Sequence, residues 1–225
     1  MNRDSYIKVT AYMLSPIAGE LPFLDALLEY EMALHEGKAV KIRRWERMPE
    51  YGEIHIPVLR RRIGDVLVPC CSAPIAASST EYVERFGKRL SVERAGLLAD
   101  KSRTVVSMSS GYLKAYHLPL RVRNISKIVW FAVAERKPVL SLLRSVHSLG
   151  HNRGMGYGRV AHWEAERVDE DFSWFASSPA GLVLMRPLPW CAELPSGLIG
   201  WRRDFGAVQP PMWHPDRYME RVVPC

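Results

Sequence analysis

The segment Gly150-His-Asn-Arg-Gly-Met-Gly-Tyr-Gly-Arg-Val160 sets the architecture that we expect for this chain. Four glycines fall within nine residues of it, at Gly150, Gly154, Gly156 and Gly158. Glycine accepts positive φ angles and lets another backbone come close, but it loses more conformational entropy on folding than any other residue. A run of this density therefore indicates a loop with a definite task.

The flanking sequence predicts a helix before this loop and a strand after it. Residues Lys137 to Leu149 carry apolar side chains at helical spacing, with Pro138 in the first turn and Gly150 at the C-terminal cap. Residues Arg159 to Val168 have the pattern of a strand. Dinucleotide-binding loops and P-loops need the reverse order, because the helix that follows them points its N-terminus at the phosphates. We therefore exclude both kinds of nucleotide site.

The side chains between the glycines favour contact with a nucleic acid. Arg153 and Arg159 offer cations for phosphates, while His151, Asn152 and Tyr157 offer rings and hydrogen-bonding groups for bases. The alternative is a flexible connection between helix and strand that binds nothing. The loop residues by themselves leave this alternative open.

The composition indicates a globular protein whose net charge favours binding to an acidic partner. The chain has 225 residues, 48% of them hydrophobic, with a net charge of +7 and a pI near 9.4. This balance favours nucleic acid first and an anionic membrane second. No apolar run is long enough to cross a bilayer, and the N-terminus lacks the apolar core of a signal peptide, so we expect a cytoplasmic protein. The four cysteines lack the C-x2-C spacing of zinc sites, and we expect free, mostly buried thiols.

The order of predicted elements gives the fold class. A strand over Tyr6–Leu14 precedes a helix that starts at Pro22 and ends before Gly37. Two strands over Glu53–Arg62 and Val66–Pro69 follow, and the apolar strand Lys127–Ala134 leads into the helix, glycine loop and strand described above. Two β-α-β units in this order predict an α+β, ferredoxin-like (RRM-like) β-α-β-β-α-β fold. We expect residues 1–225 to form a single domain, in which an irregular extension rich in Trp and Pro, residues 171–225, packs on the rest.

The segment from Arg85 to Lys127 has the most one-sided charge in the chain. It holds ten basic residues against only Glu93 and Asp100. A merely solvated face would mix the two signs, so we expect an extended hairpin that reaches over a polyanion.

These features together resemble the repeat-associated (RAMP) superfamily of CRISPR proteins. The glycine loop, the element order and the inserted basic segment carry that resemblance. The segments Val9–Gly19, Leu24–Leu28, Ser109–Tyr116 and Val129–Val133 resemble, more narrowly, the Cas-five-group subunit of type IV CRISPR effector complexes. The resemblance spans most of residues 6–168.

The resemblance implies a non-catalytic subunit of a CRISPR ribonucleoprotein effector complex. Such a subunit binds the 5′ handle of the guide RNA (crRNA), caps the backbone filament and contacts the start of the guide-target DNA duplex. Its partners would be guide RNA, target DNA, and the backbone and large subunits, with no cofactor and no membrane. The RNA-binding residues implied are Gly150, His151, Asn152, Arg153, Gly154, Gly156, Tyr157, Gly158, Arg159, Ser109, Gly111 and Lys114. Residues 80–115 would form a thumb-like insertion that contacts nucleic acid through Arg85, Lys88, Arg89, Arg94, Lys101 and Arg103.

The main alternative is a metal-independent endoribonuclease that processes precursor guide RNA. That chemistry needs a general base and a general acid, usually histidines. His35 and His151 are candidates, but a histidine at a helix end, as at His35, commonly interacts with the helix dipole. Lys114 and Tyr116 form a weaker candidate pair. We therefore expect no catalytic residue and, since no HExxH sequence surrounds His147 and His151, no metal site.

Overall fold

Strands predominate in the described part of the chain, and two α-helices pack on them, so the architecture is α+β. We analysed a computed structural model, which describes residues 5–38, 54–89, 91, 93–94, 97, 114–191 and 194–225. The helices are α1 (Leu24–His35) and α3 (Arg136–Leu143). Short 3-10 turns lie at Arg153–Met155 and Pro215–Arg217.

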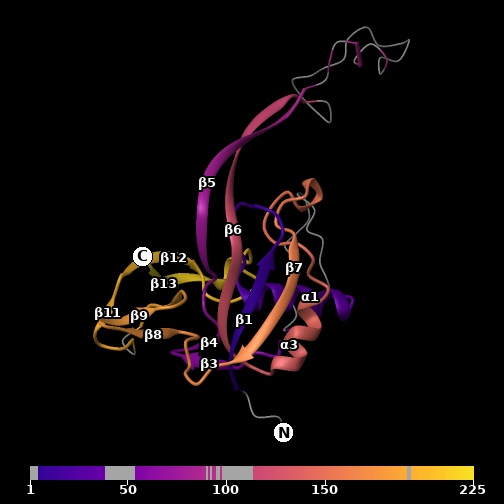
Figure 1. Cartoon of the computed structure of the whole chain (residues 1–225). Helices are drawn as coiled ribbons and strands as arrows, with labels where there is room; N and C mark the ends of the chain where they lie inside the picture. Colours follow the sequence, from indigo (N-terminus) through magenta and orange to yellow (C-terminus); the bar gives the residue numbers. More distant parts are fainter. Residues whose placement is uncertain are drawn as a thin grey trace.

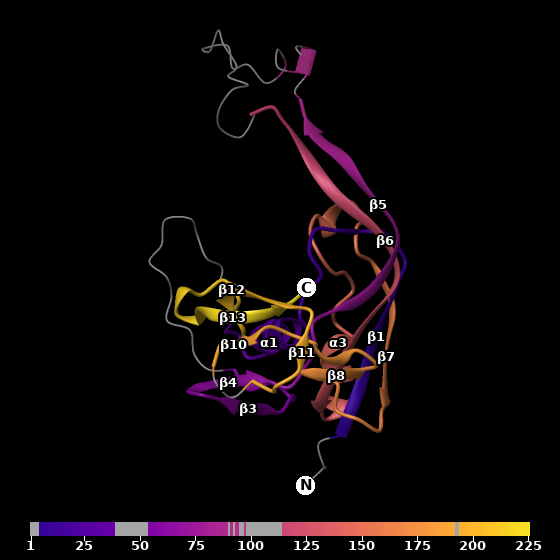
Figure 2. The ribbon, with the colours of Figure 1, turned by 90° about the vertical axis from the view of Figure 1, so that its left-hand side faces the viewer.

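The main sheet is antiparallel and has five strands (Figure 1). Across it lie β5 (Ile75–Lys88), β6 (Tyr116–Ala134), β1 (Ser5–Met13) and β7 (Val160–Arg167). The short β2 (Ile17–Ala18) continues the line of β1 along β6. β5 and β6 run far beyond the other strands, and together they leave the body as one long, twisted hairpin (Figures 1 and 2).

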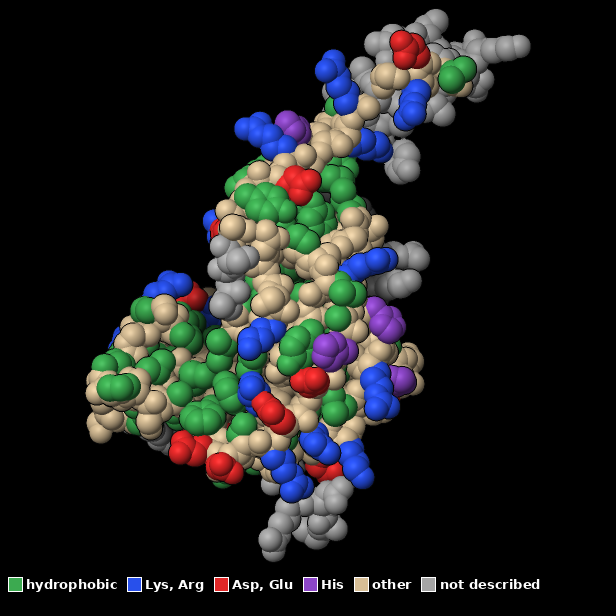
Figure 3. Space-filling view, viewed as in Figure 1, with side chains coloured by type: hydrophobic (Ala, Val, Ile, Leu, Met, Phe, Trp, Pro, Cys, Tyr) green, Lys and Arg blue, Asp and Glu red, His purple; other side chains and the backbone are tan. Residues whose placement is uncertain are grey.

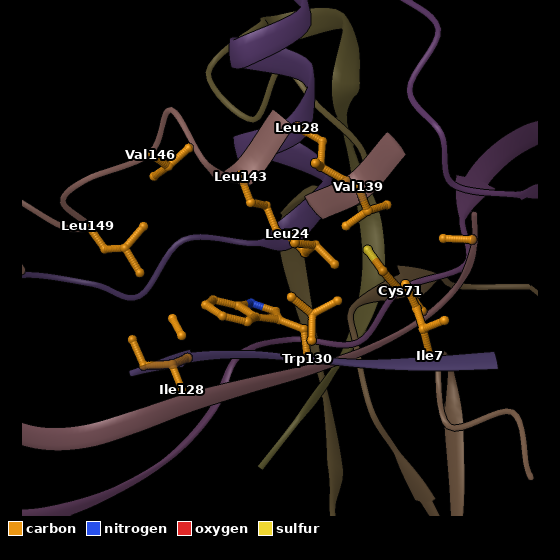
Figure 4. Packing of buried hydrophobic residues seen from close by; sticks show 14 of the residues in the cluster. Ile7, Leu24, Leu28, Cys71, Ile128, Trp130, Val139, Leu143, Val146 and Leu149 are labelled. Carbon is orange, nitrogen blue, oxygen red and sulfur yellow. The ribbon is translucent and has the colours of Figure 1, made fainter. Parts of the chain in front are cut away.

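Both helices cover one face of this sheet, and the main hydrophobic core lies between the two layers (Figure 4). Period-two alternation along β1 places Ile7, Val9 and Ala11 on the helix side, where all three are fully buried. The fully buried Trp130 of β6 lies beneath the helices, and its indole N–H donates to the Pro22 carbonyl at 3.1 Å. Leu28 of α1 packs into the same cluster.

The two predicted helices have different outcomes. α1 occupies the expected segment, and Gly37 follows it with φ +68°. The second helix was expected to reach Leu149, but it ends at Leu143. The predicted cap at Gly150 is therefore wrong, because the backbone of residues 147–149 pairs with the end of the glycine loop instead. The Leu149 amide donates to the Gly158 carbonyl at 2.8 Å, and the Val160 amide donates to the His147 carbonyl at 3.0 Å.

The C-terminal segment, residues 171–225, has more regular structure than the irregular, single-strand tail expected from sequence. One three-stranded sheet contains β8 (Phe175–Ser178), β9 (Gly181–Leu184) and β11 (Leu198–Ile199). A second contains β10 (Leu188–Pro189), β12 (Trp201–Ala207) and β13 (Tyr218–Pro224). The signal in the sequence is weak because four of these six strands span only two to four residues.

A separate hydrophobic cluster lies beneath these C-terminal strands. It joins Leu184, Leu188 and Val222 to Ile63 and Val68 of a small hairpin, β3 (Arg60–Ile63) and β4 (Val66–Pro69). A turn at Gly64 and Asp65 joins these two strands, and the first strand is shorter than expected because residues 54–59 lie outside it.

One buried ion pair connects the C-terminal segment to the main sheet and its helices. Arg186 and Asp25 of α1 are both fully buried, and the guanidinium Nη2 lies 3.2 Å from the carboxylate. The same guanidinium donates to the carbonyls of Pro69, Cys71 and Val208 at 2.7–2.8 Å. Burial raises the pKa of the adjacent Cys71 thiol, which therefore stays neutral and leaves the Asp25 carboxylate as the charge partner.

We predict that Arg186→Met lowers the free energy of unfolding by about 3–5 kcal/mol, since it leaves the Asp25 carboxylate buried without a cation. The double variant Asp25→Leu/Arg186→Met should recover only part of this loss, because the three carbonyls stay unpaired in both proteins. Denaturant unfolding measures the three stabilities. The exposed Arg202→Met serves as a control that should change little, and an equal loss in that control would contradict the role of the buried pair.

Candidate nucleic-acid interface

The glycine loop lies at the end of the main sheet from which the long hairpin departs. It connects α3 to β7 and packs against residues 14–19, which comprise the β1–β2 connection, β2 itself and the residue after it. The Gly158 amide donates to the Pro16 carbonyl, and the His151 amide donates to the Ala18 carbonyl, both at 2.8 Å. These hydrogen bonds attach both ends of the loop to the sheet.

Ser15 adds a side-chain contact to this attachment. Its hydroxyl donates to the Gly156 carbonyl at 2.7 Å and accepts from the Arg159 amide at 2.8 Å. Sequence analysis had assigned no role to Ser15, so its part in shaping the loop was missed. The many backbone and hydroxyl bonds to the loop do not fit the alternative of a loose connection.

Two of the four glycines are required by the packing of the chain itself. Gly158 has φ +67°, and a Cβ atom there would lie 1.8 Å from the Leu149 carbonyl oxygen. Gly150 has φ +79°, and its Cβ would lie 2.5 Å from the Ala18 carbonyl oxygen. No side chain fits at either position, so the close backbone approach at these two glycines is internal to the protein.

The other two glycines face open space. Gly156 has φ +93°, which favours glycine, but no atom of the described part of the chain lies within 4 Å of a Cβ built there. Gly154 lacks even the positive φ, and its Cβ position is equally open. Neither local conformation nor internal packing accounts for Gly154, so the space above it is where an outside backbone can come close.

The side chains around this open turn are mainly polar or basic. His151, Asn152, Arg153 and Arg159 are exposed. Among the described residues, the His151 side chain makes no hydrogen bond or ion pair, and its ring lies against Gly19. The turn thus presents two guanidinium groups, an imidazole and an amide around a bare backbone.

Tyr157 does not join this exposed group, although the sequence placed it among the RNA-binding residues. Its hydroxyl donates a short hydrogen bond to the Glu84 carboxylate of β5. This hydrogen bond raises the pKa of Tyr157 to about 12, because losing the proton would place two negative charges together. Tyr157 therefore joins the glycine loop to the long hairpin, a contact between residues 73 positions apart that the sequence could not reveal.

The hairpin carries most of the described basic residues of the predicted thumb. Arg85 and Lys88 lie on β5, Arg89 follows it, and Lys114 lies just before β6. Arg94 is also exposed, beyond the end of β5. Four other predicted contact residues, Lys101, Arg103, Ser109 and Gly111, lie outside the described part of the chain.

The hairpin also has a face that is apolar. Residues directly opposite each other in an antiparallel pair share a face, so Tyr82, Phe86, Leu118 and Tyr116 lie on the side that carries Glu84. Tyr82 and Leu118 are 42% and 56% exposed. Figure 3 shows an apolar patch at the neck of the hairpin with basic side chains beyond it. The hairpin therefore combines rings with cations, as surfaces that bind single-stranded nucleic acid do.

The candidate histidine His35 and the strand histidine His162 lie in different surroundings. His35 is the last residue of α1, and its side chain makes no hydrogen bond or ion pair among the described residues. His162 stacks on Tyr12 with ring centroids 4.3 Å apart, and its imidazole lies 3.4 Å from the Glu164 carboxylate. This exposed cluster on β1 and β7 was not predicted, because only the pairing of strands from opposite ends of the chain brings it together. No group of three or more metal-ligating side chains occurs within the described ranges.

Comparison with known proteins identifies the family. The family described as CRISPR type IV associated protein Csf3 matches residues 76–224. The match covers the long hairpin, the glycine loop and the C-terminal segment, although the sequence motifs had drawn the resemblance from residues 6–168 alone. A search of curated proteins found no match. In the described residues, no helix has both the length and the apolar character needed to span a membrane. With two thirds of its length matched, the chain belongs to the Csf3 family of CRISPR type IV associated proteins.

Proposed function

We propose that this chain is a non-catalytic subunit of a CRISPR effector complex that binds the 5′ handle of the guide RNA. Family membership supports a place in a type IV CRISPR complex together with other subunits. The RNA contact is our inference from the geometry of the glycine loop. In this proposal the subunit also caps the backbone filament and contacts the start of the guide-target DNA duplex.

The topology supports a ferredoxin-like RAMP fold for this role. The strands β1, β5, β6 and β7 alternate with α1 and α3 in the order β-α-β-β-α-β. Across the sheet the first strand lies between the third and the fourth, and the second lies at the edge. The short elements β2, β3 and β4 are additions to this pattern.

Gly154 is the observation that carries the proposal. It is exposed, it lacks positive φ, and no atom of the described residues lies within 4 Å of its Cβ position. Because neither its φ angle nor packing within the described residues requires glycine at this position, we attribute Gly154 to a ligand backbone that passes close to it. Arg153 and Arg159 beside it supply cations for phosphates, and His151 and Asn152 supply groups for unpaired bases.

The long hairpin would act as a thumb over the guide-target duplex. Its basic residues and its exposed apolar face lie beyond the body of the protein (Figure 3). In guide-directed complexes base pairing reads the target sequence, while protein contacts shape and backbone. A charged hairpin held against the glycine loop by Tyr157 and Glu84 suits that task. The proposal assigns no proton transfer to any residue, in contrast to the alternative of a processing endoribonuclease.

Gly154→Val should leave the fold intact but weaken handle binding at least tenfold, because the added side chain occupies the path of the RNA backbone. Gly158→Val is its matched counterpart and should destabilise the protein, because its Cβ meets the Leu149 carbonyl and its φ is strained. Thermal unfolding and RNA titration separate the two effects. Unchanged RNA affinity in a folded Gly154→Val protein would remove this turn from the interface.

Replacing Arg153 and Arg159 together with alanine should weaken binding and flatten its salt dependence. If each arginine contacts one phosphate of a single strand, the slope of log affinity against log salt should fall by about 1.4. Arg167→Ala is the control, because this exposed arginine ends β7 roughly 26 Å along the strand from Arg159. Equal slopes in the double variant and in wild type would mean that both arginines face solvent.

A further inference from the structure

In the C-terminal sheet formed by β10, β13 and β12, one face is buried at one end and exposed at the other. Leu188 of β10 lies opposite Val222 of β13, and both side chains are fully buried. Two positions further along the same face, Trp190 is 37% exposed. The Trp190 amide donates to the Glu220 carbonyl at 3.0 Å, so this row continues the sheet beyond β10.

Two further aromatic side chains share the bare end of this face. Phe205 of β12 lies opposite Glu220, and Tyr218 lies two residues before Glu220 on β13. Phe205 and Tyr218 are 63% and 46% exposed, and their ring centroids lie 6.1 Å apart. Exposed rings grouped beside a buried core are typical of a surface that a partner covers.

Arg203 completes this group, which we call the aromatic patch (Trp190, Arg203, Phe205 and Tyr218). Its guanidinium lies 3.7 Å from the centre of the Trp190 ring, and among the described residues it has no carboxylate partner. Trp190 stacks in turn on Trp201, with centroids 5.7 Å apart. The guanidinium is thus oriented by the ring while its charge remains available to a carboxylate from outside.

An open pocket adjoins the patch and shares Trp190 with it. Its volume is about 420 Å³, and its wall is formed by Trp190, Cys191, Leu194, Pro195, Leu198 and Trp201. This lining is mainly apolar. It suits an apolar or aromatic side chain from a partner, in the manner of the anchor residues at the centres of protein interfaces.

The composition of the patch favours a protein partner over a nucleic acid. Glu220 lies on the same face between Trp190 and Phe205, so the patch holds one exposed carboxylate beside the single cation of Arg203 and lacks the excess of positive charge that a run of phosphates needs. The Trp190 ring is already engaged by Trp201 and Arg203, which leaves it poorly placed to stack on a base. Trp, Tyr, Phe and Arg are, by contrast, the residues enriched in protein-protein interfaces.

We propose that the aromatic patch and its adjoining pocket dock a neighbouring protein subunit of the CRISPR complex. The partner inserts an apolar side chain into the pocket, packs apolar atoms on Phe205 and Tyr218, and pairs a carboxylate with Arg203. This docking rests on the part of the proposed function that makes the chain a complex subunit, and it does not depend on RNA binding at the glycine loop.

Assembly of the complex from its co-expressed subunits and guide RNA, with an affinity tag on this chain, tests the proposal. Phe205→Ser/Tyr218→Ser and Arg203→Glu should each reduce the retention of at least one protein subunit tenfold or more. Tyr30→Ser is the matched control, because Tyr30 is a similarly exposed ring on α1, at 52%. Retention of every protein subunit by both patch variants would overturn the proposal.

Two further readouts keep the result specific. The patch variants should melt within about 2 °C of wild type, since the altered side chains are largely exposed, and the isolated variants should bind handle RNA within twofold of wild type. Loss of RNA affinity with all protein subunits retained would make the patch a nucleic-acid surface and overturn the docking. If wild type itself binds no handle RNA, the RNA role fails while subunit retention still decides this proposal.

A photo-crosslinking residue, p-benzoylphenylalanine, placed at position 205 in the assembled complex identifies the occupant directly. We expect an adduct with another protein subunit, and none when the same probe stands at position 30. An adduct with guide RNA, or no adduct at position 205, would contradict the docking.

Discussion

The buried guanidinium of Arg186 joins parts of the chain that would otherwise be separate. It neutralises Asp25 on α1 and binds backbone carbonyls before β5 and after β12. This one guanidinium therefore contacts the helix layer, the segment that leads into β5 of the long hairpin, and the C-terminal sheets. Burying an ion pair gains little net stability, but breaking one is costly, so the pair specifies how these parts sit together. This junction therefore also sets the position of the aromatic patch relative to the glycine loop.

The four glycines of the loop fall into two pairs with different roles. Gly158 lets the loop approach its own backbone, and Gly150 lets it approach β2, at distances that exclude a side chain, while Gly154 and Gly156 leave a bare surface outside. Ser15 and the hydrogen bonds to residues 16 and 18 fix that surface to the sheet. Tyr157 then ties it to Glu84 on the hairpin. In our proposal one RNA handle and one duplex therefore contact a single preorganised corner of the protein, which reduces the entropic cost of binding.

Local patterns in the sequence predicted the strands β1 and β7, the last part of β6, the helix α1 and the position of the glycine loop. Their periodicity arises from burial on one face, which neighbouring residues report. The pattern failed where a distant partner decides the outcome. Val146 and Leu149 continue a helical spacing, yet backbone pairing with the loop exit ends α3 earlier. The contacts Asp25–Arg186, Glu84–Tyr157 and Tyr12–His162 join residues that only the folded chain brings together. For the same reason, sequence analysis could not separate the four glycines into the two pairs that the structure shows.

The central claim is that the glycine loop holds the 5′ handle of a guide RNA without cutting it. The most direct measurement incubates the purified chain, without metal, with a labelled guide RNA that carries its repeat-derived handle, beside an RNA with a scrambled handle. One gel then reports both binding and cleavage. Our account predicts a preference for the true handle with both RNAs intact. Equal binding to the two RNAs, or cleavage at one position within the repeat, would contradict it.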